Sequence, residues 1–131
     1  MKLLLDTHVL VLLANEPERM DLAMQAAVFN PAIPLTVSVT SIWEIRIKSQ
    51  LRFSSGDPKL ALHPDAALRL AEEIGCRILP ISAQHAATRL RVPLLHRDPF
   101  DDLLLVPAQV EDLQLLTRDE LLWGHPLVAP I

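Results

Sequence analysis

Short apolar runs that resemble strands alternate with helical stretches along the whole chain, and this alternation limits the possible folds more than any other feature. The strand-like runs cover residues 2–5, 35–39, 77–81 and 113–116. Strands that are separated by helices pair in parallel, and a parallel sheet needs helices on both of its faces. The sequence therefore predicts an α/β fold with a mostly parallel, four- to five-stranded sheet.

The intervening segments predict the helices and their ends. Helices are expected up to Asn15, over residues 20–29, from Ser41 to residue 51, from Pro64 to residue 74, from Ser82 to residue 90, after Asp98, and briefly after residue 117. Serine and aspartate favour the position before a helix, and proline favours its first turn. Each predicted strand is thus followed by a helix.

Length and composition predict one intracellular domain over residues 1–131. Half of the residues are hydrophobic but only 4% are aromatic, so aliphatic side chains must build the core. Cys76 is the single cysteine, which excludes an internal disulfide or a cysteine-rich zinc site and fits the cytoplasm as a buried structural thiol. No apolar run reaches the length of a membrane span, and Asp6 interrupts the apolar start. We therefore expect no membrane association.

The net charge of −4 argues against a protein that coats nucleic acid without specificity. It does not exclude an enzyme that takes RNA at one site, because a bound cation reverses the charge of a carboxylate pocket. Basic residues could contact phosphates or simply form solvated surfaces. These residues are Arg46, Lys48, Arg52, Lys59, Arg89, Arg91 and Arg97.

Four carboxylates lie at strand ends or helix starts. Asp6 closes the first strand, Glu44 lies in the helix after the second, Asp101 starts the helix before the fourth, and Asp119 follows the fourth. Open parallel sheets place their sites at the carboxyl ends of the strands. We therefore expect these side chains to converge from distant parts of the sequence.

Such a set suits a divalent cation. Mg²⁺ and Mn²⁺ prefer oxygen ligands, and phosphodiester hydrolysis uses a cation to polarise the phosphoryl group and to generate hydroxide near neutral pH. Thr7 and Thr117, next to two of the acids, could hold carboxylates by hydrogen bonds or simply finish their strands. The five histidines show no paired ligand spacing, and only His96, beside the acidic string, merits a test as a ligand.

Helix capping is the alternative interpretation of most of these acids. Ser41 and Glu44 match a capping box, and Asp98 followed by Pro99 matches a helix cap. Asp101 and Asp119 would then complement helix dipoles. Asp6 is harder to explain in this way, because burying a carboxylate after an apolar strand is costly without a partner.

The position of Glu44 on its predicted helix permits a role in a site. At about 100° per residue, Trp43, Ile47 and Leu51 form an inward stripe, and Glu44 lies roughly 60° from its centre. The stripe predicts that these three side chains are buried and that Glu44 lies at the shoulder of the buried face.

Together these residues resemble the PIN-domain family, and specifically the VapC-type toxins of bacterial toxin–antitoxin pairs. The ordered motifs span nearly the whole chain. They are Leu3-Leu-Leu-Asp-Thr-His8, Ser38-Val-Thr-Ser-Ile-Trp-Glu-Ile45, Leu79-Pro-Ile-Ser82, Val92-Pro-Leu-Leu-His-Arg-Asp-Pro-Phe-Asp101 and Leu115-Leu-Thr-Arg-Asp119.

The resemblance implies a PIN-like three-layer sandwich and an endoribonuclease that uses Mg²⁺ or Mn²⁺. Carried over by position, it implies that Asp6, Glu44, Asp101 and Asp119 are the catalytic and metal-binding residues. Asp98 belongs to the same string, but we interpret it as a helix cap. It further implies an RNA substrate, a small cognate antitoxin protein as partner, and a homodimer.

Two residues depart from this branch of the family and leave alternatives open. Asp102 stands where arginine is usual, and Pro107 stands where glutamine is common, within the predicted last long helix. Proline there should kink the helix.

A PIN-fold binding module with weakened catalysis is one alternative function. A metal-dependent phosphatase is another, although such enzymes want a second aspartate at position 8, which is His8 here.

Overall fold

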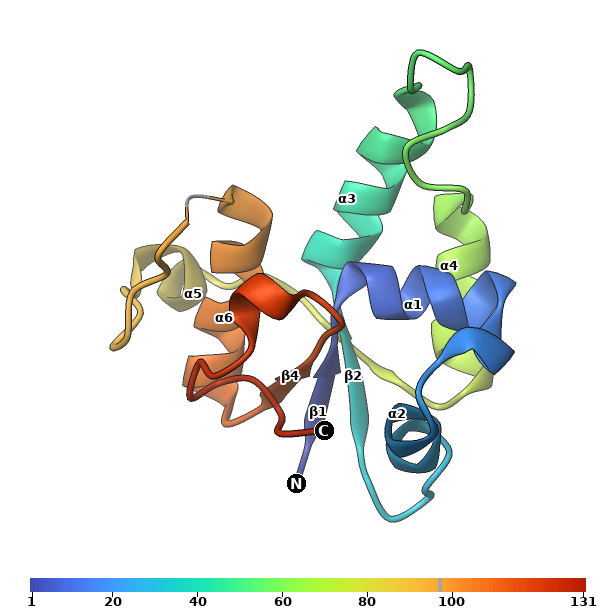
Figure 1. Cartoon of the computed structure of the whole chain (residues 1–131). Coiled ribbons are helices and arrows are strands. Elements are labelled where there is room, and N and C mark those ends of the chain that lie inside the picture. Colours follow the sequence, from blue (N-terminus) through green and yellow to red (C-terminus); the bar gives the residue numbers. More distant parts are fainter. Residues whose placement is uncertain (97) are drawn as a thin grey trace.

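Four short parallel strands form the central sheet of the computed structural model, which describes residues 1–96 and 98–131. The strands lie in the order β3-β2-β1-β4 (Figure 1). Their bounds are β1 (Leu3–Leu5), β2 (Leu35–Ser38), β3 (Arg77–Leu79) and β4 (Gln114–Leu116). Each of the three strand pairs is parallel, so the carboxyl ends of all four strands lie at one edge of the sheet. The predicted parallel sheet is confirmed, with four strands.

Helices alternate with these strands as the sequence predicts. They are α1 (Thr7–Asn15), α2 (Leu22–Val28), α3 (Val39–Gln50), α4 (Pro64–Glu73), α5 (Ala83–Ala87) and α6 (Pro99–Glu111), with single 3-10 turns η1 (Pro17–Arg19) and η2 (Glu120–Leu122). The predicted start of α3 at Ser41 is wrong, because the Ser38 hydroxyl accepts from the Thr40 N–H and caps the helix three residues earlier. Helix α5 ends at Ala87 rather than at residue 90.

Two aliphatic clusters on opposite faces of the sheet make the structure three-layered. Leu3 and Leu5 belong to a core that includes residues of α1, α2 and α4. Leu4 belongs to a second core with Leu104 and Leu105 of α6. Figure 1 shows α1, α2 and α4 on one side of the strands and α5 and α6 on the other. The sandwich expected from the resemblance is confirmed.

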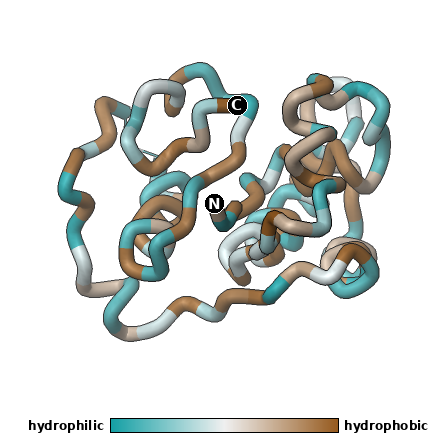
Figure 2. The backbone as a smooth tube through the Cα atoms, turned by 90° about the horizontal axis from the view of Figure 1, so that it is seen from below, coloured by the Kyte–Doolittle hydropathy of each residue, from teal (hydrophilic) through white to brown (hydrophobic). Residues whose placement is uncertain are grey.

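The helices that cover the sheet are amphipathic. Hydrophobic and hydrophilic residues alternate along the helical turns in Figure 2, as in elements that cover a sheet with one side. Helix α6 continues through Pro107, which is buried on its inner face. None of the helices described is long and apolar enough to cross a membrane.

Cys76 is predicted to be a buried thiol, and the structure shows it half-buried. It stands one position before β3, where it packs against the first core from its margin. Burial nevertheless raises the pKa of the thiol to about 11. The group therefore stays a protonated thiol at neutral pH.

The central position of Leu4 makes it a direct test of the three-layer packing. Its side chain is fully buried between the sheet and α6. Leu4→Ala should lower the free energy of unfolding by about 2–5 kcal/mol, because it leaves a cavity in a core that cannot close over it. Leu22→Ala is the control, since Leu22 is 83% exposed and its loss should cost about 0.5 kcal/mol or less. Equal effects in urea denaturation would contradict this packing.

Candidate metal centre at the carboxyl ends of the strands

Asp6 occupies the point where β1 becomes α1. Its side chain is only 4% exposed, and Oδ1 accepts a hydrogen bond of 2.7 Å from the Thr7 N–H, so the carboxylate caps α1. Its backbone N–H donates to the Leu116 carbonyl, which continues the pairing with β4. The sheet thereby fixes Asp6 beside the residue that follows β4.

That residue is Thr117, and its hydroxyl fixes the second Asp6 oxygen. Thr117 Oγ1 donates to Asp6 Oδ2 at 2.5 Å and accepts from the Asp119 N–H at 3.0 Å. A hydroxyl that donates in one direction and accepts in the other has no freedom to rotate. Thr117 is therefore a carboxylate-holding residue, the first of the two roles considered for it.

Thr7 plays the same part for Glu44. Its hydroxyl lies 2.7 Å from Glu44 Oε1 and 2.9 Å from Ser41 Oγ. The other carboxylate oxygen accepts from Lys48 Nζ at 2.5 Å. The capping-box interpretation of Glu44 is wrong, because Ser38 caps α3 and Ser41 lies buried inside it. Glu44 instead points toward the end of β1.

The predicted inward stripe of α3 is also wrong. Trp43 and Leu51 are 46% and 45% exposed, whereas Glu44 and Ile45 are buried. Three of the four buried residues of α3 are polar (Thr40, Ser41 and Glu44), so a pattern that counts only apolar residues points to the wrong side. Glu44 lies at the centre of the buried face rather than at its shoulder.

Asp101 and Asp98 start α6 in different roles. Asp98 Oδ1 accepts from the Phe100 N–H at 2.9 Å, so the predicted helix cap is confirmed. Asp101 is 8% exposed, and its Oδ2 lies 3.0 Å from His96 Nε2. The capping alternative for Asp101 therefore does not account for its side chain, which points to His96.

Asp119 caps η2 and also lies close to Asp101. Its Oδ1 accepts from the Leu121 N–H at 3.0 Å and caps η2. Asp119, Asp101 and His96 each offer one atom that could bind a metal ion, and these three atoms lie within 4.8 Å of one another. Sequence reasoning kept His96 outside the acidic set, and its place next to the Asp98–Asp101 string was the only sign that it belonged there.

Burial and mutual repulsion act on the acids together. The pKa of Asp101 is raised by burial and by the negative charges of Asp98, Asp6 and Asp119, while the His96 hydrogen bond opposes the rise. Burial also raises the pKa of Asp6, against the Thr117 hydrogen bond and the nearby His8, with Glu44 adding repulsion. All four predicted acids thus belong to one electrostatically coupled group.

These residues fit a hard divalent cation. Carboxylate oxygens are the ligands that Mg²⁺ and Mn²⁺ prefer, and a bound cation would offset the burial and the repulsion that raise the pKa values of Asp6 and Asp101. Within the described residues, every buried side-chain polar atom has a hydrogen-bond partner, and threonines orient two of the acids. The site is therefore ordered by the protein itself.

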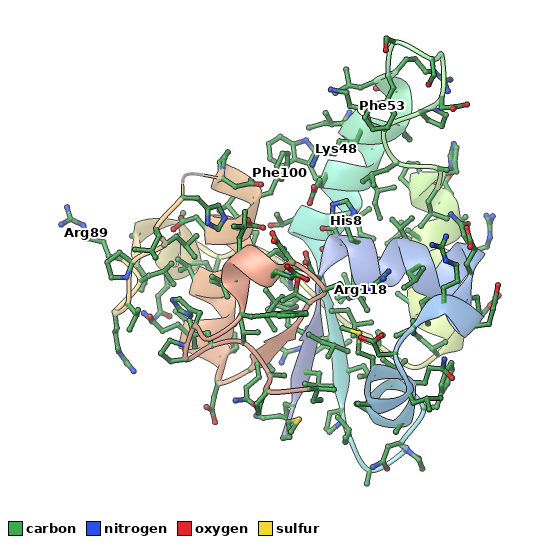
Figure 3. The ribbon with its side chains drawn as sticks, viewed as in Figure 1. His8, Lys48, Phe53, Arg89, Phe100 and Arg118 are labelled. Atoms are coloured by element: carbon green, nitrogen blue, oxygen red, sulfur yellow. The ribbon has the colours of Figure 1, made fainter. Side chains whose placement is uncertain are left out.

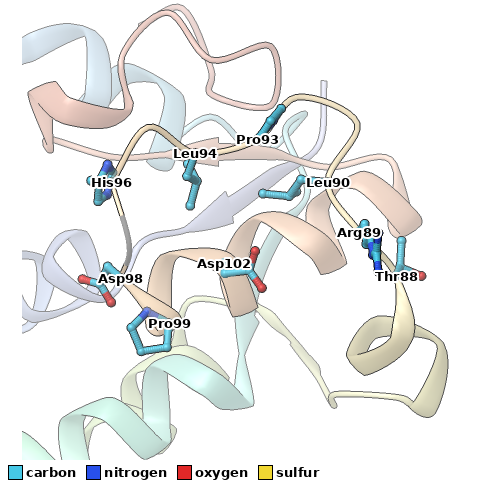
Figure 4. A pocket seen from close by; sticks show the side chains of 9 residues that line it. All are labelled: Thr88, Arg89, Leu90, Pro93, Leu94, His96, Asp98, Pro99 and Asp102. Carbon is cyan, nitrogen blue, oxygen red and sulfur yellow. The ribbon is translucent and has the colours of Figure 1, made fainter.

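A pocket of about 620 Å³ adjoins the acidic group. His96 and Asp98 line one end of it and Arg89 the other, with Asp102 between them (Figure 4). Leu90, Pro93 and Leu94 give it an apolar wall. Asp102, the departure noted in the sequence, thus faces this pocket rather than the coupled acids.

The basic residues divide into two groups. Lys48 is bound to Glu44 and lies beside the site with Phe100, whereas Arg89 is remote from both (Figure 3). Arg46, Arg52, Lys59 and Arg91 are exposed, which agrees with both alternatives considered for them, phosphate contact and a solvated surface. Arg97 lies outside the described residues.

A parallel three-layer α/β domain with coupled carboxylates at the carboxyl edge of its sheet is the class of protein that this geometry defines. The model of the PIN domain family matches residues 3–122. The chain therefore belongs to the PIN-domain family. PIN domains are generally nucleases.

Solved structures support the same fold. A crystal structure of VapBC2 from Rickettsia felis bound to a DNA fragment from its promoter aligns with a TM-score of 0.68 at 17% identity, over 98% of this chain and 96% of that one. A toxin–antitoxin complex from Klebsiella pneumoniae aligns with a TM-score of 0.61 at 22% identity, over 96% and 94%. No curated protein sequence matches this chain.

The coupled charges predict how metal-free stability depends on pH. Folding raises the pKa of some carboxyl groups above the ordinary value of about 4. Such a group contributes stability below that ordinary pKa, and the contribution is lost as the pH rises through the pKa of the folded state. Asp6 and Asp101 are both of this kind. The pKa of His96 is also raised, first by its bond to Asp101, so its contribution is present below its ordinary pKa and lost as pH rises through the raised one.

In chelator, the melting temperature should therefore fall as pH rises from about 4 toward neutrality. Asp101→Asn should raise the melting temperature at pH 7, because the amide keeps an acceptor for His96 without the charge. Asp112→Asn, at the exposed left-handed end of α6, is the control and should change little. A lower melting temperature for Asp101→Asn than for the unaltered protein would show that this carboxylate is structural.

Proposed function

We propose that this protein is an endoribonuclease that depends on Mg²⁺ or Mn²⁺ and acts as the toxin of a toxin–antitoxin pair. The observation that carries the proposal is the group formed by Asp101, Asp119 and His96, whose ligand atoms lie within 4.8 Å of one another. Asp6 lies close enough to repel Asp101, and Glu44 lies close enough to repel Asp6. The nuclease character of PIN domains supports this assignment.

In the proposed site, Asp6 and Asp101 hold the main cation, and Glu44 and Asp119 complete or orient it. When bound, Mg²⁺ or Mn²⁺ polarises the phosphoryl group and lowers the pKa of a water molecule to near neutrality. The protein supplies fixed geometry: Thr7 holds Glu44 and Thr117 holds Asp6, so these two carboxylates need little rearrangement.

Charge explains why the cation and the phosphate would bind together. A phosphodiester is an anion, and it would be repelled by several buried carboxylates without a cation between them. Lys48, bound to Glu44 and only partly buried, adds a positive charge at the edge of the site. His8, exposed and close enough to lower the pKa of Asp6, adds another when protonated.

The proposed acid set predicts the effect of single substitutions on RNA cleavage. Asp101→Asn and Asp6→Asn should each lower kcat/KM for a mixed RNA pool by a factor of about 10³ or more, since losing one cation ligand removes several kcal/mol of transition-state stabilisation. Circular dichroism should report an unchanged fold. Asp112→Asn is the matched control and should cleave normally.

Full activity in either site variant would overturn the assignment of residues. Binding of RNA without any cleavage by the unaltered protein, in Mg²⁺ or Mn²⁺, would instead favour the PIN-fold binding module. A phosphatase would release inorganic phosphate from a phosphomonoester and leave the RNA chain intact, so the same assay separates all three functions.

We further propose a small antitoxin that places a basic side chain against the acids. The two solved neighbours are toxin–antitoxin assemblies, and the coupled acids form a strongly negative target. An arginine fork matches paired carboxylates. We also propose that residues 1–131 act as one domain, as a homodimer in the cytoplasm.

The antitoxin proposal predicts that a small protein encoded beside this chain suppresses its toxicity. Expression of the chain alone should arrest growth, and co-expression with the neighbouring gene should restore it. Arginine-to-alanine variants of that partner should identify one residue whose loss weakens neutralisation by at least tenfold. Growth arrest that no neighbouring product relieves would contradict the proposed pairing.

A further inference from the structure

Two aromatic side chains that touch each other lie beside the acidic site. Trp43 on α3 directly precedes Glu44, and Phe100 on α6 directly precedes Asp101. Their ring centroids are 5.7 Å apart at an angle of 57°. The pair therefore joins the two helices that carry two of the four acids, and we call it the Trp43–Phe100 platform.

The core of the protein does not need this platform. Neither core cluster contains an aromatic side chain, and each of the five aromatic residues is at least partly exposed. Trp43 leaves 46% of its surface in water although it sits at the base of α3, one position from the buried Glu44. An indole ring kept in water beside a buried site is available to a ligand of that site.

One cation, Lys48, lies against the platform. Lys48 Nζ lies 5.2 Å from the centre of the Phe100 ring while it binds Glu44. Lys48 and Phe100 approach each other between α3 and α6 in Figure 3, and His8 lies nearby at the start of α1. Aromatic rings with cations beside them are the combination by which proteins bind single-stranded nucleic acids, since bases stack and phosphates pair with charge.

Resting on the proposed ribonuclease function, we propose that the Trp43–Phe100 platform stacks an unpaired base of the RNA strand whose phosphate lies at the acids. Stacking accepts any base but requires a free base face, which a duplex does not offer. The platform thus selects single-stranded RNA and positions the nucleotide next to the bond to be cut. Trp43 is a positioning residue in this scheme.

Tryptophan fluorescence reports stacking directly, because the chain has only Trp43 and Trp123. Trp123→Phe leaves Trp43 as the sole indole, and Trp43→Phe leaves Trp123. Each variant is titrated with a ten-nucleotide random-sequence RNA, with Ca²⁺ replacing Mg²⁺ and intact RNA verified on a gel. A ten-unit abasic ribose–phosphate strand carries the same charge without bases. The platform predicts quenching of Trp43 by the RNA but not by the abasic strand, and no such difference for Trp123.

A substitution series at Trp43 separates stacking from packing. Trp43→Leu keeps an apolar contact with Phe100 but has no ring, so its affinity for the RNA should fall about 5- to 150-fold. Trp43→Phe keeps a ring and should lose less. In cleavage with Mg²⁺, the loss should fall mainly on KM. Leu121→Ala is the control, because Leu121 is 75% exposed on η2 and makes no part of the platform.

Three results would overturn the platform. These are equal quenching by both strands, normal RNA affinity in Trp43→Leu, or a Trp43→Leu variant that changes only the oligomeric state or the binding of a protein partner. Failure of the proposed function is distinct: the unaltered protein would then cleave no RNA at all, whatever stands at position 43. Normal cleavage with normal KM in Trp43→Leu leaves the ribonuclease intact and rejects the platform alone.

Discussion

The hydrogen bond from the Thr117 hydroxyl to the Asp6 carboxylate is the contact on which the site depends. It joins residues 111 positions apart and follows from the pairing of β1 with β4, which sets the ends of these strands side by side. The same hydroxyl accepts from the Asp119 N–H, so one side chain links two of the acids. The register between β1 and β4 therefore fixes the positions of Asp6 and Asp119 relative to each other.

Helices α3 and α6 supply the remaining acids, Glu44 and Asp101. Thr7 connects α1 to Glu44, while His96 offsets the charge of Asp101. The resulting group is unfavourable by itself, because burial and repulsion raise the pKa of both Asp6 and Asp101. Such strain is retained where a ligand that binds only the folded form compensates for it, and a divalent cation is the ligand that fits.

The sequence predicts the centre of the sheet well because β1 is fully buried and appears as a continuous apolar run. Asp6 and the Asp98 cap could be placed from local rules alone. The buried face of α3 could not, because it is mostly polar, and its residues Ser41 and Glu44 find their partner in Thr7 of α1. His96 could be named only as a residue to test, since its bond to Asp101 arises in a loop without periodicity.

The central claim is that the four acids form one divalent-cation site. Calorimetric titration of Mn²⁺ into the chelator-treated protein tests it most directly, with Asp101→Asn and Thr117→Val in parallel. The account predicts saturable binding by the unaltered protein, at least tenfold weaker binding by Asp101→Asn, and an intermediate loss in Thr117→Val, which frees Asp6 without removing a ligand. Absence of saturable Mn²⁺ binding, or equal affinity in all three proteins, would contradict it.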